Sequence, residues 1–470
     1  MKYFLFLFVF LFACAVSGQE NRFVSIPDSV NAVPGKSYHL RSIFITGNKH
    51  TRDRVIHREM SVKEGALIPS DSLNLVLDLN QKRIFNLSIF TEATIAVLKV
   101  DDSTIDWHIK VTEQWYIIPE ISFQLADRNF NVWWKEQERD IRRANIGVTL
   151  KHRNFRGNLE QLSATAQIGY TQKFGLEYFK PYVDRRQQHG LGASFFFSKN
   201  EEMFFTTNLN KLQFVKTPRN YVISRFEAAA VYVYRPGYAT RHLIELRYRD
   251  YRVDDTVIKL NPEYYDNGSS ELNSMELSYR FDLNKVDNWN YPLVGLKLVG
   301  NFISRVGFKG IGFQNTAYVE AAKFYHLGHK WYSSNIVRAR VMAPQRQPYA
   351  FRSALGVEPD YVRGYEYYVV DGSQFGVLRN SLKYELLNTS IRSIPFKYLP
   401  VLPIRLYPKI FADVGYVVNK FPGNSFLNNR LLYAAGFGLD IISAYDFKLR
   451  LEYTWNHLGE KGLFLHLNTE

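Results

Sequence analysis

The chain has 470 residues, of which 46% are hydrophobic and 16% aromatic, yet its mean hydropathy is negative at -0.25. This composition excludes a polytopic helical membrane protein, because each helical span needs a run of about 20 apolar residues. The formal net charge of +14 is compatible with a nucleic-acid partner. The export signal described next argues against nucleic acid and favours contact with acidic lipid or a solvated pore lining.

The one long apolar run of the sequence, YFLFLFVFLFACAV, lies near the N-terminus and precedes the small residues of a secretory cleavage site. We expect residues 1–18 to be a signal peptide and residues 19–37 an N-terminal linker. A lipoprotein signal that ends at Cys14 is the alternative, and the bulky Phe12 argues against it. Cleavage removes the single cysteine, so we expect no disulfide and no thiolate metal site or nucleophile in the mature chain.

Residues 38–115 show a mixed pattern of strands and helices. YHLRSIFITG is a predicted strand, RDRVIHREM a short helix after Thr51, and SLNLVLDLNQKRIF a helix with an apolar stripe. The strands TEATIAVLKV and STIDWHIKVTEQW complete a β-α-α-β-β order. This order predicts a small α+β domain with helices on one face of its sheet. An extended partner could add a strand to the edge of such a sheet.

Residues 117–470 have a period of two instead. In QLSATAQIGY, MELSYRFDL and DFKLRLEYTWN, apolar side chains alternate with polar or charged ones. Alternating segments of about 10 residues are typical of a transmembrane β-barrel with a polar interior, whereas strands in soluble proteins usually have about 5–6 residues. We therefore expect an all-β, closed antiparallel transmembrane barrel of about 16 strands. Residues 202–215 fit either a strand extension or a loop.

The longest stretch without alternation, residues 343–375, contains DYVRGYEYYVVDG and is expected to be an extracellular loop inserted in the barrel. In the next two strands, alternation predicts that Glu385 and Asp413 face the lumen at similar heights. Two unit charges ~4 Å apart attract by about 4 kcal/mol at an effective dielectric near 20. In a lumen partly shielded from water, the economical interpretation is that the loop enters the lumen and Arg363 bridges both carboxylates, with Gly364 permitting a tight turn. A solvated loop charge is the alternative.

Three motifs, in chain order, resemble those of one protein family. GNKHTRDRVIHREM, KEGALI and IFNLSIFTEATI resemble a POTRA domain, the periplasmic module of the BamA/TamA family of outer-membrane assembly proteins. VRGY, from Val362 to Tyr365, is similar to the loop-six signature of that family, and FADVG, from Phe411 to Gly415, is similar to its motif on strand thirteen. The resemblance covers nearly all of the mature chain and identifies a form with a single POTRA domain.

The resemblance implies a location, a set of partners and a site. It implies an outer-membrane barrel with the POTRA domain in the periplasm. The loop arginine of the family contacts acids on strands twelve and thirteen, which implies that Arg363 contacts Glu385 and Asp413. The expected partners are unfolded outer-membrane β-barrel proteins or exported polypeptides, with periplasmic chaperones, accessory lipoproteins and outer-membrane lipids. No nucleic acid and no cofactor are expected.

Two features depart from the family pattern. One POTRA domain is present where the housekeeping assembly factor usually has several, which puts the accessory lipoproteins in doubt. The final strand ends in Asn468-Thr469-Glu470 rather than on an aromatic residue, and Pro119 removes a backbone donor from the first strand. A weak seam between these strands would suit a lateral gate for client strands. Pro119 fits a simple domain junction equally well.

These observations favour an assembly factor that captures unfolded β-barrel clients through the POTRA domain and inserts them through the barrel seam. A dedicated polypeptide secretion pore of the same build and a passive porin are the alternatives. The sequence has no HExxH, GxSxG or Walker motif, so we expect no enzyme and assign no catalytic, cofactor-binding or metal residue. His457 and His466 near the last hairpin could touch, but interfacial or lumen positions are the preferred interpretation.

Overall fold

The computed structural model describes residues 35–87, 89–184, 186–217, 221–237, 239–357, 359–391, 402–443 and 447–466. The expected signal peptide, residues 1–18, and most of the expected linker, residues 19–37, lie outside the described residues.

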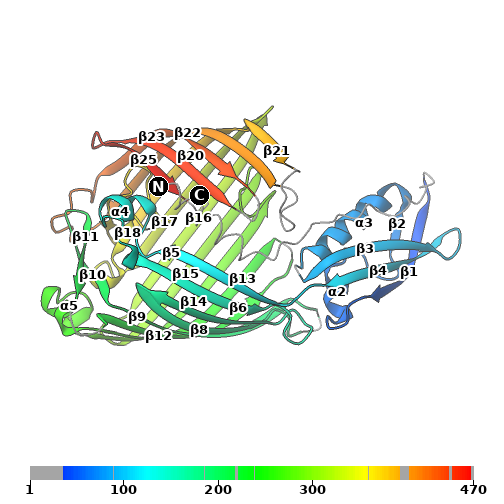
Figure 1. Ribbon diagram of the computed structural model, residues 1–470, viewed down its shortest axis with the longest axis horizontal. Coiled ribbons are helices and arrows are strands. Elements are labelled where there is room, and N and C mark those ends of the chain that lie inside the picture. Colours follow the sequence, from blue (N-terminus) through cyan, green and yellow to red (C-terminus); the bar gives the residue numbers. More distant parts are fainter. Residues whose placement is uncertain are drawn as a thin grey trace.

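The first domain is a four-stranded mixed sheet with two helices packed against it (Figure 1). The strand order is β2-β1-β4-β3, in which β1 and β4 are parallel and the outer pairs are antiparallel. The elements are β1 (Ser37–Thr46), α2 (Asp53–Glu59), β2 (Leu67–Pro69), α3 (Ser70–Phe85), β3 (Phe90–Lys99) and β4 (Thr104–Glu113).

Helix α3 packs on this sheet because its apolar residues recur at helical spacing. Leu73, Leu77 and Ile84 are at most 2% exposed and share a core with Trp107 of β4. The strand β2 was missed by the sequence pattern, which predicted only a break between the helices. Its few residues pair with the start of β1 but are too few to show a period of two.

The remaining chain forms a large antiparallel β-barrel (Figure 1). In its strand order β25 lies next to β5. The prediction of a small α+β domain followed by an antiparallel barrel is confirmed. The barrel strands are β5 (Ile117–Leu125), β6 (Ala144–His152), β7 (Gln161–Gly169), β8 (Thr171–Lys180), β9 (His189–Asn200), β12 (Ile223–Tyr234), β13 (Thr240–Val253), β14 (Glu271–Val286), β15 (Gly295–Lys309), β16 (Gln314–Gly328), β17 (Trp331–Ala343), β20 (Gln374–Tyr384), β21 (Leu387–Ile391), β22 (Leu402–Val418), β23 (Leu431–Ile442), β24 (Lys448–Asn456) and β25 (Lys461–His466).

Two of these segments, β20 and β21, run along the same neighbour and make one interrupted strand. Lys383 pairs with Lys409, but Leu387 pairs with Leu406, so the register against β22 shifts by one residue between the two segments. The described barrel has 17 segments in its strand order. Taking β20 and β21 together gives 17 - 1 = 16 strands among the described residues, the number expected from the alternation.

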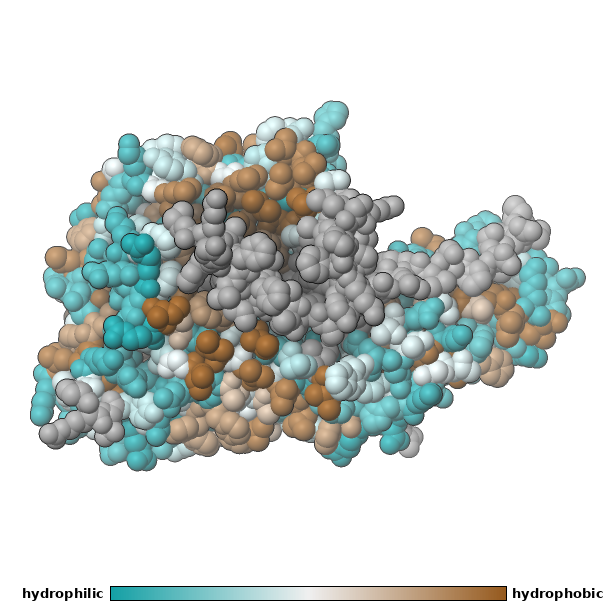
Figure 2. All heavy atoms as spheres, viewed as in Figure 1, coloured by the Kyte–Doolittle hydropathy of each residue, from teal (hydrophilic) through white to brown (hydrophobic). Residues whose placement is uncertain are grey.

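The alternation separates an outer apolar face from a polar lumen. In β20, Arg379 and Ser381 are at most 4% exposed, whereas Leu378, which precedes Arg379 and points to the opposite side of the wall, is 39% exposed. On the side of the molecule drawn in Figure 2, hydrophobic residues gather over the barrel strands and hydrophilic residues gather at the end away from the first domain. Within the described part of the chain, no helix is long and apolar enough to cross a membrane.

Several short elements lie in the connections at the barrel end away from the first domain (Figure 1). Residues 202–215, which fitted either a strand extension or a loop, belong to a separate two-stranded hairpin. These elements are α4 (Phe130–Lys135), η1 (Ile141–Arg143), β10 (Glu202–Asn208), β11 (Lys211–Lys216), α5 (Asp255–Leu260) and η2 (Asp266–Gly268).

The first domain contacts the near end of the barrel through side chains of the β6–β7 connection. Arg54 Nη2 donates a hydrogen bond to Asn158 Oδ1 at 2.6 Å, and Asn154 Nδ2 donates to Thr51 Oγ1 at 2.9 Å. The two domains are therefore joined by specific polar contacts as well as by the chain.

Candidate functional site

The long connection between β17 and β20 folds back into the barrel lumen, as the sequence analysis expected. It contains the short elements η3 (Tyr349–Phe351), β18 (Ser353–Leu355) and β19 (Val370–Asp371). Val362, Arg363 and Tyr365 of the VRGY segment are at most 3% exposed. We call residues 343–375 the lumen loop.

Arg363 forms a two-pronged ion pair with Asp413 of β22. Its Nη2 donates to Oδ1 at 2.5 Å, its Nε donates to Oδ2 at 2.8 Å, and its backbone N–H also donates to Oδ2 at 3.1 Å. Both side chains are 0% exposed. The planar guanidinium matches both carboxylate oxygens, which makes this pair stronger and more directional than a single contact. The structure thus brings together two residues predicted for the clamp.

The remaining surface of the Arg363 guanidinium is also occupied. Nη1 donates to Ser381 Oγ at 3.0 Å, and Nη2 donates to the backbone carbonyl of Asn380 at 3.2 Å. The guanidinium carbon lies 3.9 Å from the centre of the Phe411 ring, within the range of a cation–π contact. Arg363 therefore joins the lumen loop to two adjacent strands, β20 and β22.

The prediction that Glu385 is the second acid of the clamp was wrong. Asp413 pairs with Arg379 in β20, and Glu385 lies 385 - 379 = 6 residues further along the chain. Six residues of a strand span about 20 Å, so the two carboxylates are at different heights in the barrel. Glu385 instead accepts a hydrogen bond from Tyr407 Oη at 3.2 Å.

Glu452 of β24 is the second carboxylate near Arg363, and the sequence analysis missed it. Its Oε1 lies 3.4 Å from Arg363 Nη1 and 2.7 Å from Lys409 Nζ, and all three side chains are 0% exposed. Gly438 of β23 pairs with both Lys409 and Glu452. A Cβ at Gly438 would lie 3.1 Å from Glu452 Cγ and 2.5 Å from the Leu451 carbonyl oxygen, so the glycine leaves room for Glu452 to reach across.

The FADVG motif places an aromatic ring, a carboxylate and a glycine on successive inward-facing positions of β22, at Phe411, Asp413 and Gly415. Phe411 lies under the guanidinium of the loop and Asp413 binds it. A Cβ at Gly415 would lie 2.5 Å from Val362 Cγ2, so this glycine makes room for the loop. Gly436 likewise makes room for the Phe411 side chain, because a Cβ at Gly436 would lie 2.7 Å from the Phe411 ring.

Gly364 turns the lumen loop immediately after the arginine. Its φ is +90°, a conformation that side-chain-bearing residues rarely adopt. Its N–H donates to Glu366 Oε2 at 2.7 Å, and its carbonyl accepts from Asn456 Nδ2 at 2.8 Å. Tyr365 follows with a hydrogen bond between its Oη and His457 Nδ1. Arg363, Gly364 and Tyr365 are thus tied to β24 and the turn after it.

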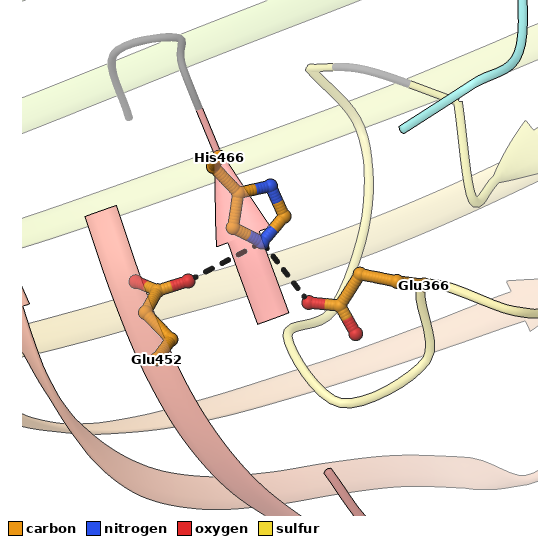
Figure 3. Close-up of side chains that lie close together, drawn as sticks. All are labelled: Glu366, Glu452 and His466. Atoms are coloured by element: carbon orange, nitrogen blue, oxygen red, sulfur yellow. Dashed lines mark ion pairs between the residues drawn. The ribbon is translucent and has the colours of Figure 1, made fainter. Parts of the chain in front are cut away.

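Glu366, Glu452 and His466 meet beside this turn (Figure 3). His466 Nε2 lies 3.3 Å from Glu366 Oε1 and 3.4 Å from Glu452 Oε2, and all three side chains are at most 1% exposed. They form the one group of acids and histidines with metal-binding spacing in the described part of the chain. Glu452 already contacts Lys409 and Arg363, so the chain supplies the positive charge itself, and we assign no metal here.

The lumen loop also encloses two further carboxyl groups. Burial raises the pKa of Asp360 and of Asp371, because a charged carboxylate is less well solvated in these positions. Asp360 Oδ1 accepts a hydrogen bond from Tyr318 Oη at 3.1 Å. Most of the described residues of the lumen loop from Gln347 onward are buried or half-buried.

Two family models match this architecture. A model described as the Omp85 superfamily domain matches residues 154–462, which is more than half of the chain. The chain belongs to the Omp85 superfamily. The POTRA model, described as surface antigen variable number repeat, matches residues 38–114 of this Omp85 protein. The resemblance to the BamA-type proteins is thereby confirmed, and the barrel lies in the outer membrane with the POTRA domain on the periplasmic side.

The Omp85 protein is similar to one curated relative and to solved structures of the same fold. It is 36% identical over 84 residues to the outer membrane protein assembly factor BamA of Neorickettsia risticii, an alignment that covers 18% of this chain and 11% of the relative. BamA from Haemophilus ducreyi lacking POTRA domains 1-3 has a TM-score of 0.58 at 15% identity, with 92% of this chain and 83% of that chain covered. CdiB from Escherichia coli has a TM-score of 0.53 at 12% identity, with 91% and 75% covered. These structures share the fold.

Proposed function

We propose that this Omp85 protein is an assembly factor that inserts β-barrel clients into the outer membrane. In this proposal the POTRA domain captures unfolded clients, and the seam between β5 and β25 opens to receive their strands. Periplasmic chaperones, accessory lipoproteins and the surrounding lipids are proposed partners. The proposal includes no cofactor and no covalent step.

The observation that carries the proposal is the lumen loop. Arg363, Asp413 and Glu452 are fully buried, and the loop fits into spaces left by glycines of the barrel wall. Separation of a buried ion pair leaves an uncompensated charge, which costs about 3–5 kcal/mol. A polypeptide that crossed through the lumen would have to displace this loop. A client that enters through the seam would leave it in place.

The POTRA sheet supports capture by strand addition. Its outer strands are β2 and β3, and β3 is the longer of the two edges. An edge strand presents unpaired backbone donors and acceptors to an extended partner, whatever the partner's side chains. Leu98 of β3 is 49% exposed and Leu67 of β2 is 71% exposed, so both edges also offer apolar contact.

A dedicated polypeptide secretion pore is the second candidate, because part of the lumen is lined by charged side chains that keep some exposure. Arg247 contacts both Glu227 and Glu245 on the β12–β13 wall, and these side chains are 22% to 27% exposed. Such a lining suits the passage of a polar chain. A passive porin has less support, since the lumen loop obstructs a channel and a porin has no need of a POTRA domain.

Depletion of the protein in its own host, followed by proteomics of the outer membrane and the culture medium, tests the proposal. The assembly function predicts that many outer-membrane β-barrel proteins fall together. Loss of one or a few exported polypeptides, with other barrels at their normal level, would instead support the secretion pore.

A further inference from the structure

The last barrel strand, β25, is bound by a side chain from another connection. Asn131 lies on α4, in the connection between β5 and β6. Its Nδ2 donates to the backbone carbonyl of Leu463 at 2.8 Å, and its Oδ1 accepts from the backbone N–H of Leu465 at 3.0 Å. One side-chain amide therefore binds the two backbone groups that flank Phe464.

This contact reproduces the pairing that a neighbouring strand would make. An asparagine side chain offers the same donor and acceptor chemistry as a backbone peptide group. Backbone N–H and C=O groups of successive residues in a strand point to opposite sides. Phe464 pairs with Glu452 of β24, so its neighbours Leu463 and Leu465 direct their backbone groups away from β24. That side is the seam, because β5 follows β25 in the strand order. The Leu465 N–H has one hydrogen to donate. While Asn131 accepts it, no strand can.

The residues just before Asn131 are attached to the lumen loop. Arg128 Nη1 donates to the carbonyl of Tyr368 at 2.9 Å, and Asn129 Nδ2 donates to the carbonyl of Glu366 at 2.9 Å. Asn129 also caps the N-terminus of α4, since its Oδ1 accepts a hydrogen bond from the N–H of Val132. The position of Asn131 is therefore set by a helix that is anchored on the lumen loop.

The lumen loop also contacts the side chains of β25. The ring of Tyr367 lies 5.5 Å from that of Phe464, and the ring of Tyr361 stacks on His466 at 5.4 Å. Among the described residues β25 spans 6 positions, all of which pair with β24, and these ring contacts from the lumen loop add to that pairing.

We propose that Asn131 is a latch on the seam, and that an extended polypeptide can pair with β25 at Leu463 and Leu465 only after this amide has left. The ligand of this edge is the backbone of an extended chain. Release needs only the side chain of Asn131 to move, so the lumen loop that Arg128 and Asn129 bind can stay in place. That the incoming strand belongs to a client rests on the proposed function. The two hydrogen bonds between the Asn131 side chain and β25 do not depend on that function.

Hydrogen–deuterium exchange of the full-length protein in lipid nanodiscs, followed on peptides that cover residues 461–466, tests the latch. Asn131→Ala removes both hydrogen bonds, and we expect the amides of this segment to exchange about tenfold faster. Asn131→Asp keeps an acceptor for the Leu465 N–H but loses the donor to Leu463. We expect its exchange rate to lie between those of the wild type and Asn131→Ala.

Trp134→Ala is the matched control on the same helix. The Trp134 ring contacts Phe130 and Arg139 within the same connection, so its removal alters α4 but leaves the amide of Asn131. We expect unchanged exchange in residues 461–466. Equal acceleration in Trp134→Ala and Asn131→Ala, or none in Asn131→Ala, overturns the latch. The samples contain no client, so the result is independent of whether depletion supports the assembly function.

Discussion

At the scale of single residues, Arg363 and Asp413 stabilise the lumen loop only as a pair. Both are fully buried, so removal of either leaves a charge in a poorly solvated place. The geometry also explains why lysine would be a poor replacement at position 363. A lysine ammonium is a compact point charge, which cannot reproduce the two parallel contacts that Nε and Nη2 of Arg363 make with Asp413.

Arg363→Ala should release the lumen loop, because the loss of one partner of a buried ion pair costs about 3–5 kcal/mol. The expected result is faster proteolysis within residues 343–375 in intact cells. Arg346→Ala is the matched control, since Arg346 lies in the same loop but is 72% exposed in its ion pair with Glu263. Exposed pairs contribute about 0–1 kcal/mol. Equal cleavage of the wild type and Arg363→Ala would contradict the clamp.

Glu452→Gln and Glu385→Gln distinguish the observed clamp from the one expected from the sequence. Glu452→Gln removes a buried carboxylate that faces Lys409 and Arg363, so we expect the folded barrel to convert to the unfolded form at a lower temperature. Glu385→Gln should leave that temperature unchanged. Gel migration of unboiled samples heated stepwise measures the conversion. A lower conversion temperature for Glu385→Gln than for Glu452→Gln would refute this assignment.

Alternation predicted which side chains face the lumen but not their heights. Asp413 and Arg363 could be paired from the motifs and the inward parity. Glu452 was on the polar face of DFKLRLEYTWN, so its inward direction was readable, but its approach to Arg363 depends on the register across β23 and on the space left by Gly438. Register between strands is a tertiary property, and no local pattern of one strand specifies it.

At the scale of elements, the barrel strands were predictable because each has one face in lipid and one in a polar lumen. Elements outside the lipid-and-lumen environment could not be predicted in this way. The short strand β2 and the β10–β11 hairpin carry no long alternation, and the register shift between β20 and β21 shows only in their pairing with β22. Helix α4 was also unforeseen, as its few residues carry no helical period of their own.

The junction between the POTRA domain and the barrel should weaken at low pH. Glu113 at the end of β4 accepts from the backbone N–H of Thr51 at 2.6 Å and of His50 at 3.1 Å. Burial tends to raise the pKa of Glu113, but these hydrogen bonds outweigh it and hold the pKa below its ordinary value of 4.5. The carboxylate therefore stabilises the folded junction above pH 4.5, and this contribution is lost as the pH falls through the lowered pKa.

Proteolysis of the segment around residues 47–53 across a pH series measures this effect. The wild type should be equally resistant at every pH above 4.5 and become more sensitive below it. Glu113→Gln should be more sensitive than the wild type at neutral pH and change less on acidification. A wild-type profile that matches Glu113→Gln throughout would rule out this role of Glu113.

At the scale of the whole molecule, the POTRA domain and the barrel have separable roles in the proposed function. Deletion of residues 38–115 should leave a folded, heat-modifiable barrel, because the barrel has its own strand network and its own buried clamp. Assembly activity should be lost with the capture surface. Complementation of a depleted strain measures it, and full activity of the deletion variant would exclude capture by the POTRA domain.

The central claim is that clients enter through the seam while the lumen loop stays in place. A disulfide between Val362→Cys and Gly415→Cys would lock the loop to the wall, since a Cβ at Gly415 would lie 2.5 Å from Val362 Cγ2 and the single cysteine of the sequence, Cys14, is in the expected signal peptide. The most direct measurement is the level of outer-membrane barrel proteins in a depleted strain that carries this double variant, with and without a reductant. We predict normal levels in the oxidised, locked state. Levels that fall when the lock is oxidised and recover when it is reduced would show that the loop must leave the lumen, and would contradict the account.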